Sequence, residues 1–379
     1  MAERTAYAPV MNLRRYSRHL LIPEVGVAGQ ERLSNARVLC IGAGGLGSPV
    51  LQYLAAAGVG RIGVMDDDAV DESNLQRQTI FATSDIGRSK AQVAAQRVRE
   101  INPLVSADPI AARFDASNAR ELVRLYDVVV DCTDRFETRY LINDACVLEK
   151  KPDVYGSIFR FDGQVSVFAP GHGHRVEPGP CYRCLFPQAP PAGTVPTCAE
   201  GGVLGVLAGI VGTLQANEAL KVILEIGEPL VGRLLLVDAL GARMREVAIE
   251  RDAACALCGD APSILDVTAT PEEIEAVDLD EIEPAQLDAA LAHALLLDVR
   301  EPHEAVLGLV DGATHIPASQ LPERLHELDS AQRYVVACRV GQKSLWAARL
   351  LRDAGFRRIQ HLHGGLLAYA AAHDEFQFF

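Results

Sequence analysis

Two Cys-x-x-Cys pairs, separated by residues 185–254, constrain this chain more than any other feature of its sequence. The first pair is Cys181 and Cys184, and the second is Cys255 and Cys258. Two intervening residues let both sulfurs of a pair point inward from one tight turn, and four thiolates complete the tetrahedral shell of a zinc ion. The pattern predicts a structural Zn²⁺ site that ties two distant segments together and leaves no open position for catalysis.

Length and composition narrow the class of protein. A chain of 379 residues predicts two domains, since single cores stop growing near ~250–300 residues. The net charge of −14 argues against a surface that binds nucleic acid. Nine cysteines, with no apolar signal segment in residues 1–15, favour a reducing compartment, and we expect a cytoplasmic protein. The longest apolar stretch, residues 203–214, is too short for a membrane span, which needs ~20 residues.

The first two thirds of the chain have the pattern of alternating strands and helices. Such a series predicts an α/β fold, a Rossmann-like doubly wound and mainly parallel sheet. We expect two short polar helices within residues 12–35. The expected strands are residues 37–41, 61–65, 127–131, 153–158, 164–169, 233–237 and 244–249, and the expected helices are residues 48–57, 89–101, 137–150 and 203–226.

The pattern restarts on a smaller scale after the second cysteine pair. Residues 259–277 are rich in Pro, Thr and Glu and predict a linker between a domain of residues 12–258 and one of residues 278–379. In the second domain we expect strands at residues 295–298, 334–337 and 358–361 and a helix at residues 344–353. The sequence predicts a smaller α/β domain here.

A glycine-rich loop, residues 42–47, joins the first strand to the next helix. Glycines permit a tight turn, and a helix N-terminus favours an anion, so the loop predicts a nucleotide site with Asp66 on the ribose. Alone, the motif fits a nicotinamide or flavin enzyme equally well. The polar run at residues 73–78, Lys90 and Asp134 shift the balance, because a triphosphate with Mg²⁺ needs donors and a carboxylate that hydride transfer does not.

Several of these motifs together resemble one family. GAGGLG, SNLQRQ, Lys90, the CTD of residues 132–134, the CYRC of residues 181–184 and the PTC of residues 196–198 are similar to the ubiquitin-activating-like adenylyltransferases. The branch that this chain resembles is the molybdopterin-synthase adenylyltransferases with a fused rhodanese domain. The resemblance covers residues 12–258 and the tail, and it implies ATP, Mg²⁺ and Zn²⁺ as cofactors.

The resemblance implies roles for individual residues. Gly45 would contact the phosphates, Asp66 the ribose, and Asp134 would hold magnesium. Arg18 matches an arginine that reaches the nucleotide of the partner subunit, which implies a homodimer. Arg135 stands where the family often has asparagine. The implied nucleotide contacts are completed by Ser73, Asn74, Leu75, Gln76, Arg77 and Lys90.

Cys198 is left over from the two pairs and has two interpretations. It is either a buried or incidental thiol, or, as the family resemblance implies, the residue that forms a thioester or a mixed disulfide with the substrate. Its position between a Pro-rich loop and a Gly-rich helix start can lower the pKa of a thiol. We interpret Cys40, Cys132 and Cys146 as core residues of strands and a helix.

The sequence from Cys338 to Ser344 predicts an anion-binding loop between a buried strand and a helix. Backbone N–H groups, the helix dipole, Arg339 and Lys343 would favour a thiolate or persulfide on Cys338. A phosphatase loop is the nearest alternative. The DVRE of residues 298–301 and the glycine pair 364–365 resemble rhodanese domains instead, although Lys343 stands where arginine is frequent and Tyr369 near a common tryptophan.

These features predict a two-step enzyme. The first domain adenylates the C-terminal glycine of a small ubiquitin-like sulfur carrier ending in Gly-Gly, and a Cys338 persulfide, loaded by a cysteine desulfurase, converts it to a thiocarboxylate. The product would serve molybdopterin, thiamine, cysteine or thiolated tRNA synthesis. Two alternatives remain at this stage: a rhodanese that docks carriers beside a degenerate, non-catalytic nucleotide domain, and a nicotinamide oxidoreductase.

Overall fold

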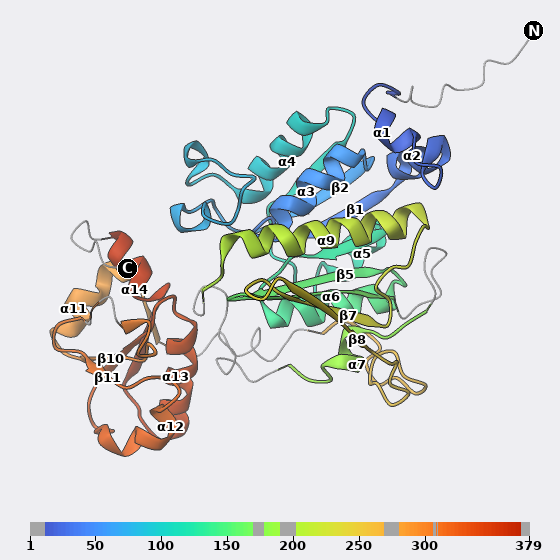
Figure 1. Ribbon diagram of the computed structural model, residues 1–379. Coiled ribbons are helices and arrows are strands. Elements are labelled where there is room, and N and C mark those ends of the chain that lie inside the picture. Colours follow the sequence, from blue (N-terminus) through green and yellow to red (C-terminus); the bar gives the residue numbers. More distant parts are fainter. Residues whose placement is uncertain are drawn as a thin grey trace, which may run out of the picture. The chain divides into compact units, whose positions relative to one another are not determined.

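The computed structural model describes residues 12–169, 178–189, 202–268, 280–305, 308 and 310–372. The described residues form two compact units (Figure 1). The larger unit contains the described residues up to Ala189 and from Val203 to Thr268, and the smaller unit contains those from Asp280 onward.

The larger unit is built on an eight-stranded sheet with the strand order β3-β2-β1-β4-β5-β6-β7-β8. Its first five strands in this order run parallel, and β6, β7 and β8 extend the sheet in antiparallel fashion. This order confirms the expected doubly wound, mainly parallel sheet. The strands are β1 (Arg37–Ile41), β2 (Arg61–Met65), β3 (Ser106–Ile110), β4 (Val128–Asp131), β5 (Asp153–Phe159), β6 (Asp162–Phe168), β7 (Arg233–Asp238) and β8 (Arg243–Ala248).

Helices cover both faces of the parallel part because its strands are apolar on both sides. On β1, Val38 and Cys40 are buried with α3 (Gly47–Ala57), α4 (Lys90–Ile101) and α9 (Gly205–Leu224). The alternate residues Leu39 and Ile41 are buried with α5 (Ala119–Arg124) and α6 (Phe136–Leu148). The short helices α1 (Ser17–Leu20) and α2 (Gly26–Asn35) precede the sheet, as expected.

Helix α9 is, among the described residues, the one helix long and apolar enough to cross a membrane by length and composition. The apolar stretch of residues 203–214 lies mostly within this helix, which was expected at residues 203–226. Of the most apolar 18-residue segment of α9, 56% is buried inside the protein. The helix contacts β4, β5 and β6. Figure 1 shows α9 lying across the sheet, which is the position of a core helix.

Two features of the larger unit differ from the sequence-based expectation. The edge strand β3 and helix α5 were not predicted. The predicted linker also begins later, because residues 259–268 pack on the larger unit: Asp266 forms an ion pair with Arg120 at 2.9 Å, and Val267 is buried beside α5 and α6. Ile264 also packs beside the paired cysteines, and Asp260 forms an ion pair with Arg251 at 3.0 Å. These isolated contacts have no regular spacing, so the sequence carries no periodic signal for them.

The smaller unit has a five-stranded parallel sheet with the order β11-β10-β12-β13-β9. The three expected strands are present, and β9 and β11 add the two edges that the sequence did not reveal. Apolar residues on both faces of β12 are buried between helices, so the unit is the expected small α/β domain. Its elements are β9 (Asp280–Ile282), α11 (Leu287–Leu291), β10 (Leu295–Asp298), β11 (Thr314–His315), α12 (Leu321–Arg324), β12 (Tyr334–Ala337), α13 (Gln342–Asp353), β13 (Ile359–Leu362) and α14 (Gly365–Ala372).

Candidate functional site

The glycine-rich loop leaves β1 at the point where the strand order reverses. Ile41 pairs with Met65 of β2 on one side and with Asp131 of β4 on the other, so three strands end together here. Ligands of doubly wound sheets bind in the crevice at such a switch point. Gly42 has a φ of +94°, and a Cβ at this position would lie 2.7 Å from the Cys132 carbonyl oxygen, so the close turn requires glycine.

Arg77 and Gly45 lie against each other in this crevice. A Cβ on Gly45 would be 3.4 Å from Cγ of Arg77 and 3.1 Å from Cβ of Ala208 on α9. Nη1 of Arg77 donates to the carbonyl oxygen of Ser73 over 3.1 Å, so residues 73–77 form one turn, and the aliphatic part of the Arg77 side chain lies over Gly45. The structure thus brings together two residues that are 32 positions apart in the sequence.

Asp66 follows β2 and is tied directly to the loop. Its Oδ2 accepts a hydrogen bond from the Ala43 N–H over 2.8 Å, and its Oδ1 accepts one from the Asp68 N–H over 3.0 Å. Burial raises the pKa of the Asp66 carboxyl. Lys90 lies at the start of α4 with its side chain buried, and its ammonium group pairs with Asp68 at 2.8 Å.

Asp134 and Arg135 lie in the turn after β4. Asp134 is exposed, and Arg135 is the N-cap residue of α6, where its N–H donates to Oγ1 of Thr133 over 3.2 Å. Arg18 is exposed on α1. Within the described ranges, no hydrogen bond or ion pair joins the Arg18 side chain to the glycine loop of its own chain.

Gln78 ends the donor-rich run of residues 73–78 but was not among the expected nucleotide contacts. Its side chain is 4% exposed, its Nε2 would lie 3.5 Å from a Cβ on Gly44, and its Oε1 has no hydrogen-bond partner among the described residues. A polar residue at the end of the donor-rich run was the available signal. A buried carboxamide with an unused acceptor beside a phosphate-type loop is a further candidate contact for a nucleotide.

The four paired cysteines converge, as expected. Their Sγ atoms lie within 4.8 Å of one another, at 3.7 Å for Cys181–Cys255 and 3.4 Å for Cys184–Cys258. Hydrogen bonds with Cys181 and Cys258 lower the pKa of Cys184 to about 2. The donor set fits a tetrahedral Zn²⁺ with no open position.

Cys338 lies at the end of β12, buried at 1% exposure. The Gly341 N–H donates to its Sγ over 3.2 Å, and its thiol lies 3.6 Å from Oγ of Ser344. Lys343 of the same loop is buried and forms an ion pair with Glu304 at 2.8 Å. The loop therefore directs a backbone N–H of Gly341 at the sulfur, an arrangement that stabilises an anion.

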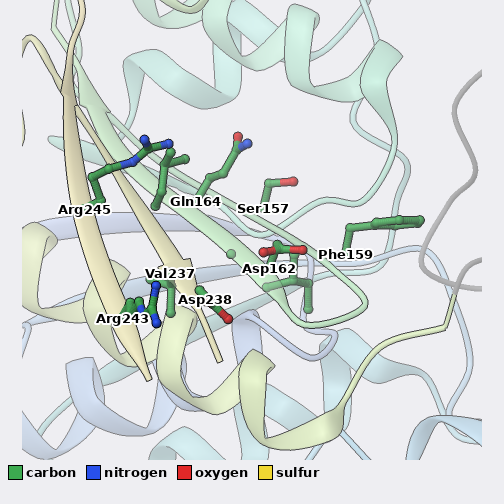
Figure 2. A pocket seen from close by; sticks show the side chains of 11 residues that line it. Ser157, Phe159, Asp162, Gln164, Val237, Asp238, Arg243 and Arg245 are labelled. Carbon is green, nitrogen blue, oxygen red and sulfur yellow. The ribbon is translucent and has the colours of Figure 1, made fainter. Parts of the chain in front are cut away.

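A pocket of about 540 Å³ opens on the antiparallel extension of the larger sheet (Figure 2). Strands β5, β6, β7 and β8 supply its lining. The side chain of Gln215 on α9 fills the space beside Gly156, so the residues of β5 next to it, Tyr155 and Ser157, face away from α9. Charged groups of both signs surround this face, namely Asp162, Asp238, Arg243 and Arg245.

Cys198 and residues 196–197 lie outside the described residues, so both interpretations of Cys198 stay predictions. Cys40, Cys132 and Cys146 are buried in β1, after β4 and in α6, as expected of core residues.

Comparison with known proteins identifies the family of this fold. Residues 16–257 match the ThiF family model, and residues 283–372 match the rhodanese-like domain model. The chain belongs to the ThiF family. The family resemblance and the presence of a rhodanese-like domain, both expected from the sequence, are confirmed.

ThiF-family relatives match along most of this chain. The probable adenylyltransferase/sulfurtransferase MoeZ of Mycobacterium tuberculosis is 46% identical over 373 residues, covering 94% of this chain and 92% of the relative. The adenylyltransferase and sulfurtransferase MOCS3 of Sus scrofa is 41% identical, covering 95% and 86%. The sulfur carrier protein adenylyltransferase of Thermus thermophilus is 55% identical and covers 66% of this chain and 92% of its own length.

Solved structures agree with the fold of the ThiF-family unit. E. coli MccB bound to MccA-N7isoASN has a TM-score of 0.57 and 23% identity, covering 65% of this chain and 75% of that one. This likeness concerns the fold alone. The relatives named above confirm the class predicted from the sequence, an enzyme with adenylyltransferase and sulfurtransferase domains.

Proposed function

We propose that this ThiF-family chain adenylates the C-terminal glycine of a small ubiquitin-like sulfur carrier and then converts that carboxylate into a thiocarboxylate. One observation supports this most strongly. A glycine loop with Arg77 over Gly45 and a sulfur-holding loop around Cys338 occur in one chain, and relatives that match nearly all of it are named adenylyltransferase and sulfurtransferase.

The first step activates a poor electrophile. A carboxylate oxygen of the carrier attacks the α-phosphorus of ATP, a bond to phosphorus forms, and pyrophosphate leaves. Arg77, Lys90 and Arg18 supply positive charge where negative charge develops, and the buried position of Lys90 strengthens its effect. Asp66 binds the ribose, and residues 73–78 orient the phosphates. Catalysis then comes mainly from positioning and electrostatics.

The second step delivers sulfur. The terminal sulfur of a Cys338 persulfide attacks the carbonyl carbon of the acyl-adenylate, and AMP leaves, so that the carrier is joined to Cys338 through an acyl disulfide. A thiol then attacks Sγ of Cys338, and the electron pair of the S–S bond leaves with the carrier thiocarboxylate. In one route Cys198 is that thiol and a Cys198–Cys338 disulfide forms, which an external thiol reduces. In the other route Cys198 first takes the carrier as a thioester.

Two cations have residues that fit them. The exposed carboxylate of Asp134 would hold Mg²⁺, which neutralises charge on the phosphates when bound. The four clustered thiolates would hold Zn²⁺ as a structural ion that joins α7 (Tyr182–Leu185) and its N-cap residue to the segment after β8.

The face of β5–β8 that is turned away from α9 is the proposed docking surface of the carrier. Figure 2 shows side chains around the pocket, among them the apolar Phe159 with charged neighbours. Leu236 of β7 also lines the pocket. A line of contacts leads from it to the nucleotide site: the Tyr155 hydroxyl donates to Oε1 of Gln164 over 3.1 Å, and the Arg139 guanidinium lies 5.3 Å from the Tyr155 ring. A carrier tail laid along this face would reach the turn of Asp134.

A homodimer is the proposed assembly. Exposed apolar side chains follow α1 in the turn to α2 and on α2 itself, such as Leu21 at 73% and Val27 at 54% exposure, and they neighbour in sequence the helix that carries Arg18. Burying these residues against a second copy would remove apolar area from water and bring Arg18 to the other nucleotide. The proposed sulfur donor is a cysteine desulfurase, and the proposed compartment is the cytoplasm.

Pyrophosphate exchange tests the adenylation step. With a carrier ending in Gly-Gly, ATP and Mg²⁺, we expect carrier-dependent exchange of labelled pyrophosphate into ATP, in the wild type and in Cys338→Ala alike. The Cys338→Ala variant should form no thiocarboxylate. Nucleotide binding without exchange would instead support the alternative of a carrier-docking rhodanese with a degenerate nucleotide domain.

A further inference from the structure

The turn that carries Asp134 is held by residues outside it. Asp131 ends β4, and its Oδ1 accepts a hydrogen bond from the Thr133 N–H over 2.9 Å. Arg139 of α6 donates from Nη2 to the Thr133 carbonyl oxygen over 3.2 Å. The donor and the acceptor of the Thr133 backbone are thus both bound by buried side chains, so the geometry of the turn depends on them.

Asp131 and Arg139 form an unusual ion pair. Their exposed fractions are 0% and 5%, yet Asp131 Oδ2 lies 3.9 Å from Arg139 Nε, too far for a hydrogen bond. Neither of these two atoms has a hydrogen-bond partner within the described ranges. Burying two charges costs much of what their attraction provides, and loose geometry worsens the balance. A gain in folding stability therefore does not explain why this ion pair is buried. Its two hydrogen bonds to the Thr133 backbone, which orient the turn, do explain it.

Gln215 holds the same strand end from the opposite face of the sheet. Its Nε2 donates to the carbonyl oxygen of Asp131 over 2.6 Å and to that of Val154 over 3.1 Å. A Cβ on Gly156 would collide with this carboxamide, so glycine at that position leaves the room that Gln215 occupies. Side chains on both faces of the sheet therefore hold the end of β4. The turn of residues 132–135 begins at a strand end whose position is fixed by these hydrogen bonds.

We propose that Asp131 is a positioning residue that acts through Thr133 to aim Asp134 at the magnesium–nucleotide complex, with Arg139 and Gln215 holding Asp131 in place. The inference rests on the proposed adenylation activity and on the proposed role of Asp134. Asp131 touches neither nucleotide nor carrier in this scheme. Its effect is on the affinity and placement of the metal, because residues that orient a metal ligand affect binding by ~10–100-fold.

Asp153 offers a matched control in the same place. It lies on β5 opposite Val129 of β4, so its side chain is on the same face of the sheet as that of Asp131. It is 2% exposed, and its Oδ1 has no hydrogen-bond partner in the described part of the chain. No hydrogen bond in the described residues joins Asp153 to the turn. A variant here alters a buried carboxyl beside Asp131 without touching Thr133.

The test measures metal binding directly. Wild-type protein saturated with a non-hydrolysable ATP analogue is titrated with Mn²⁺, and free Mn²⁺ is followed by electron paramagnetic resonance. We expect Asp131→Ala to weaken Mn²⁺ binding roughly tenfold or more, and Asp153→Asn to leave it within about twofold. Nucleotide affinity without metal should be unchanged in both. Where Asp131→Ala does not fold, the apolar double variant Asp131→Leu/Arg139→Met removes both charges and should show the same loss.

The outcomes separate this inference from the proposed function. Wild-type Mn²⁺ affinity in a folded Asp131 variant, or an equal loss in Asp153→Asn, overturns the positioning role, even if exchange activity is present. Absence of carrier-dependent exchange in the wild type overturns the proposed function instead, whatever the Mn²⁺ titration shows.

Discussion

Nζ of Lys90 lies 2.8 Å from Oδ2 of Asp68, so the buried cation of the nucleotide crevice is paired inside the protein. The side chain of Lys90 is 7% exposed and that of Asp68 is 54% exposed. The pair therefore has a fixed cation and a solvated anion, and phosphate oxygens would compete with Asp68 for the ammonium group.

This relationship predicts opposite effects for the two partners. Lys90→Met should lower the rate of carrier-dependent pyrophosphate exchange by roughly 10²–10³-fold, since one preorganised charge is lost from the transition state. Asp68→Asn should lower KM for ATP a few-fold, because an exposed carboxylate competes only weakly, by ~0–1 kcal/mol. Steady-state exchange kinetics measure both, and a rise in KM for Asp68→Asn would contradict the competition.

Gly365 should be essential for the loop that holds Cys338. Its φ is +66°, and a Cβ there would lie 2.5 Å from the Cys338 carbonyl oxygen. Gly365→Ala must therefore displace the loop, and we expect sulfur transfer from thiosulfate to cyanide to fall tenfold or more. Gly355 also has a positive φ, +96°, but a Cβ would meet nothing within 4 Å. Gly355→Ala should cost ~1–2 kcal/mol of stability and spare activity. Equal activities in the two variants would refute this explanation.

Removal of the zinc ligands should affect stability. Cys184→Ser leaves three thiolates, and we expect the purified protein to lose its bound zinc and its Tm to fall by roughly 5–10 °C for a loss of ~2–3 kcal/mol. Metal analysis and calorimetry measure the two quantities. Cys338→Ser is the control, since it should retain one zinc per chain and the wild-type transition of the larger unit. Full zinc content in Cys184→Ser would exclude the four-cysteine site.

Asp153 should make stability depend on pH. Burial raises the pKa of this carboxyl well above its usual range, and the charge of Asp131 raises it further. The folded state thus keeps a proton that the unfolded state releases above pH ~4, and stability is lost as pH rises toward the raised folded pKa. Asp153→Asn removes this loss.

The stability of Asp153→Asn relative to the wild type should therefore increase from pH 4.5 to pH 7.5, by up to ~1.4 kcal/mol per pH unit. Hydrogen exchange of the β4 and β5 amides measures the free energy of unfolding of the larger unit. Trp346, the only tryptophan of the chain, reports on the smaller unit by fluorescence and should show no difference. A relative stability that falls with pH would show that Asp153 is ionised and stabilised in the fold.

The sequence predicted the parts of the fold that have strong periodicity or distinctive residues. Buried strands such as β1 and β4 are continuous apolar runs. The spacing of the four cysteines predicted that their sulfurs would lie together, as they do. The edge strand β3 was missed because its sequence, SADPI, contains a proline and alternates only weakly, as edge strands can. The two-residue strand β11 is too short for any pattern.

The candidate site was predictable as a set of residues and much less as an arrangement. The sequence motifs identified residues 42–47, 66, 73–78 and 90. The ion pair of Lys90 with Asp68 and the hydrogen bond from the Ala43 N–H to Asp66 depend on tertiary geometry. Asp131 ends an apolar run, which predicts only the end of a strand. The hydrogen bond that it accepts from the Thr133 N–H could not be predicted from the sequence. Glu304, the partner of Lys343, is 39 positions away and carries no local signal.

Mass spectrometry of the carrier tests the central claim most directly. A purified carrier ending in Gly-Gly is incubated with this protein, ATP, Mg²⁺ and a persulfide donor, then analysed intact. We predict a gain of about 16 Da, one oxygen replaced by sulfur, that requires ATP and is absent with Cys338→Ala. A carrier that gains this mass without ATP, or one that never forms an AMP adduct and never gains it, would contradict the account.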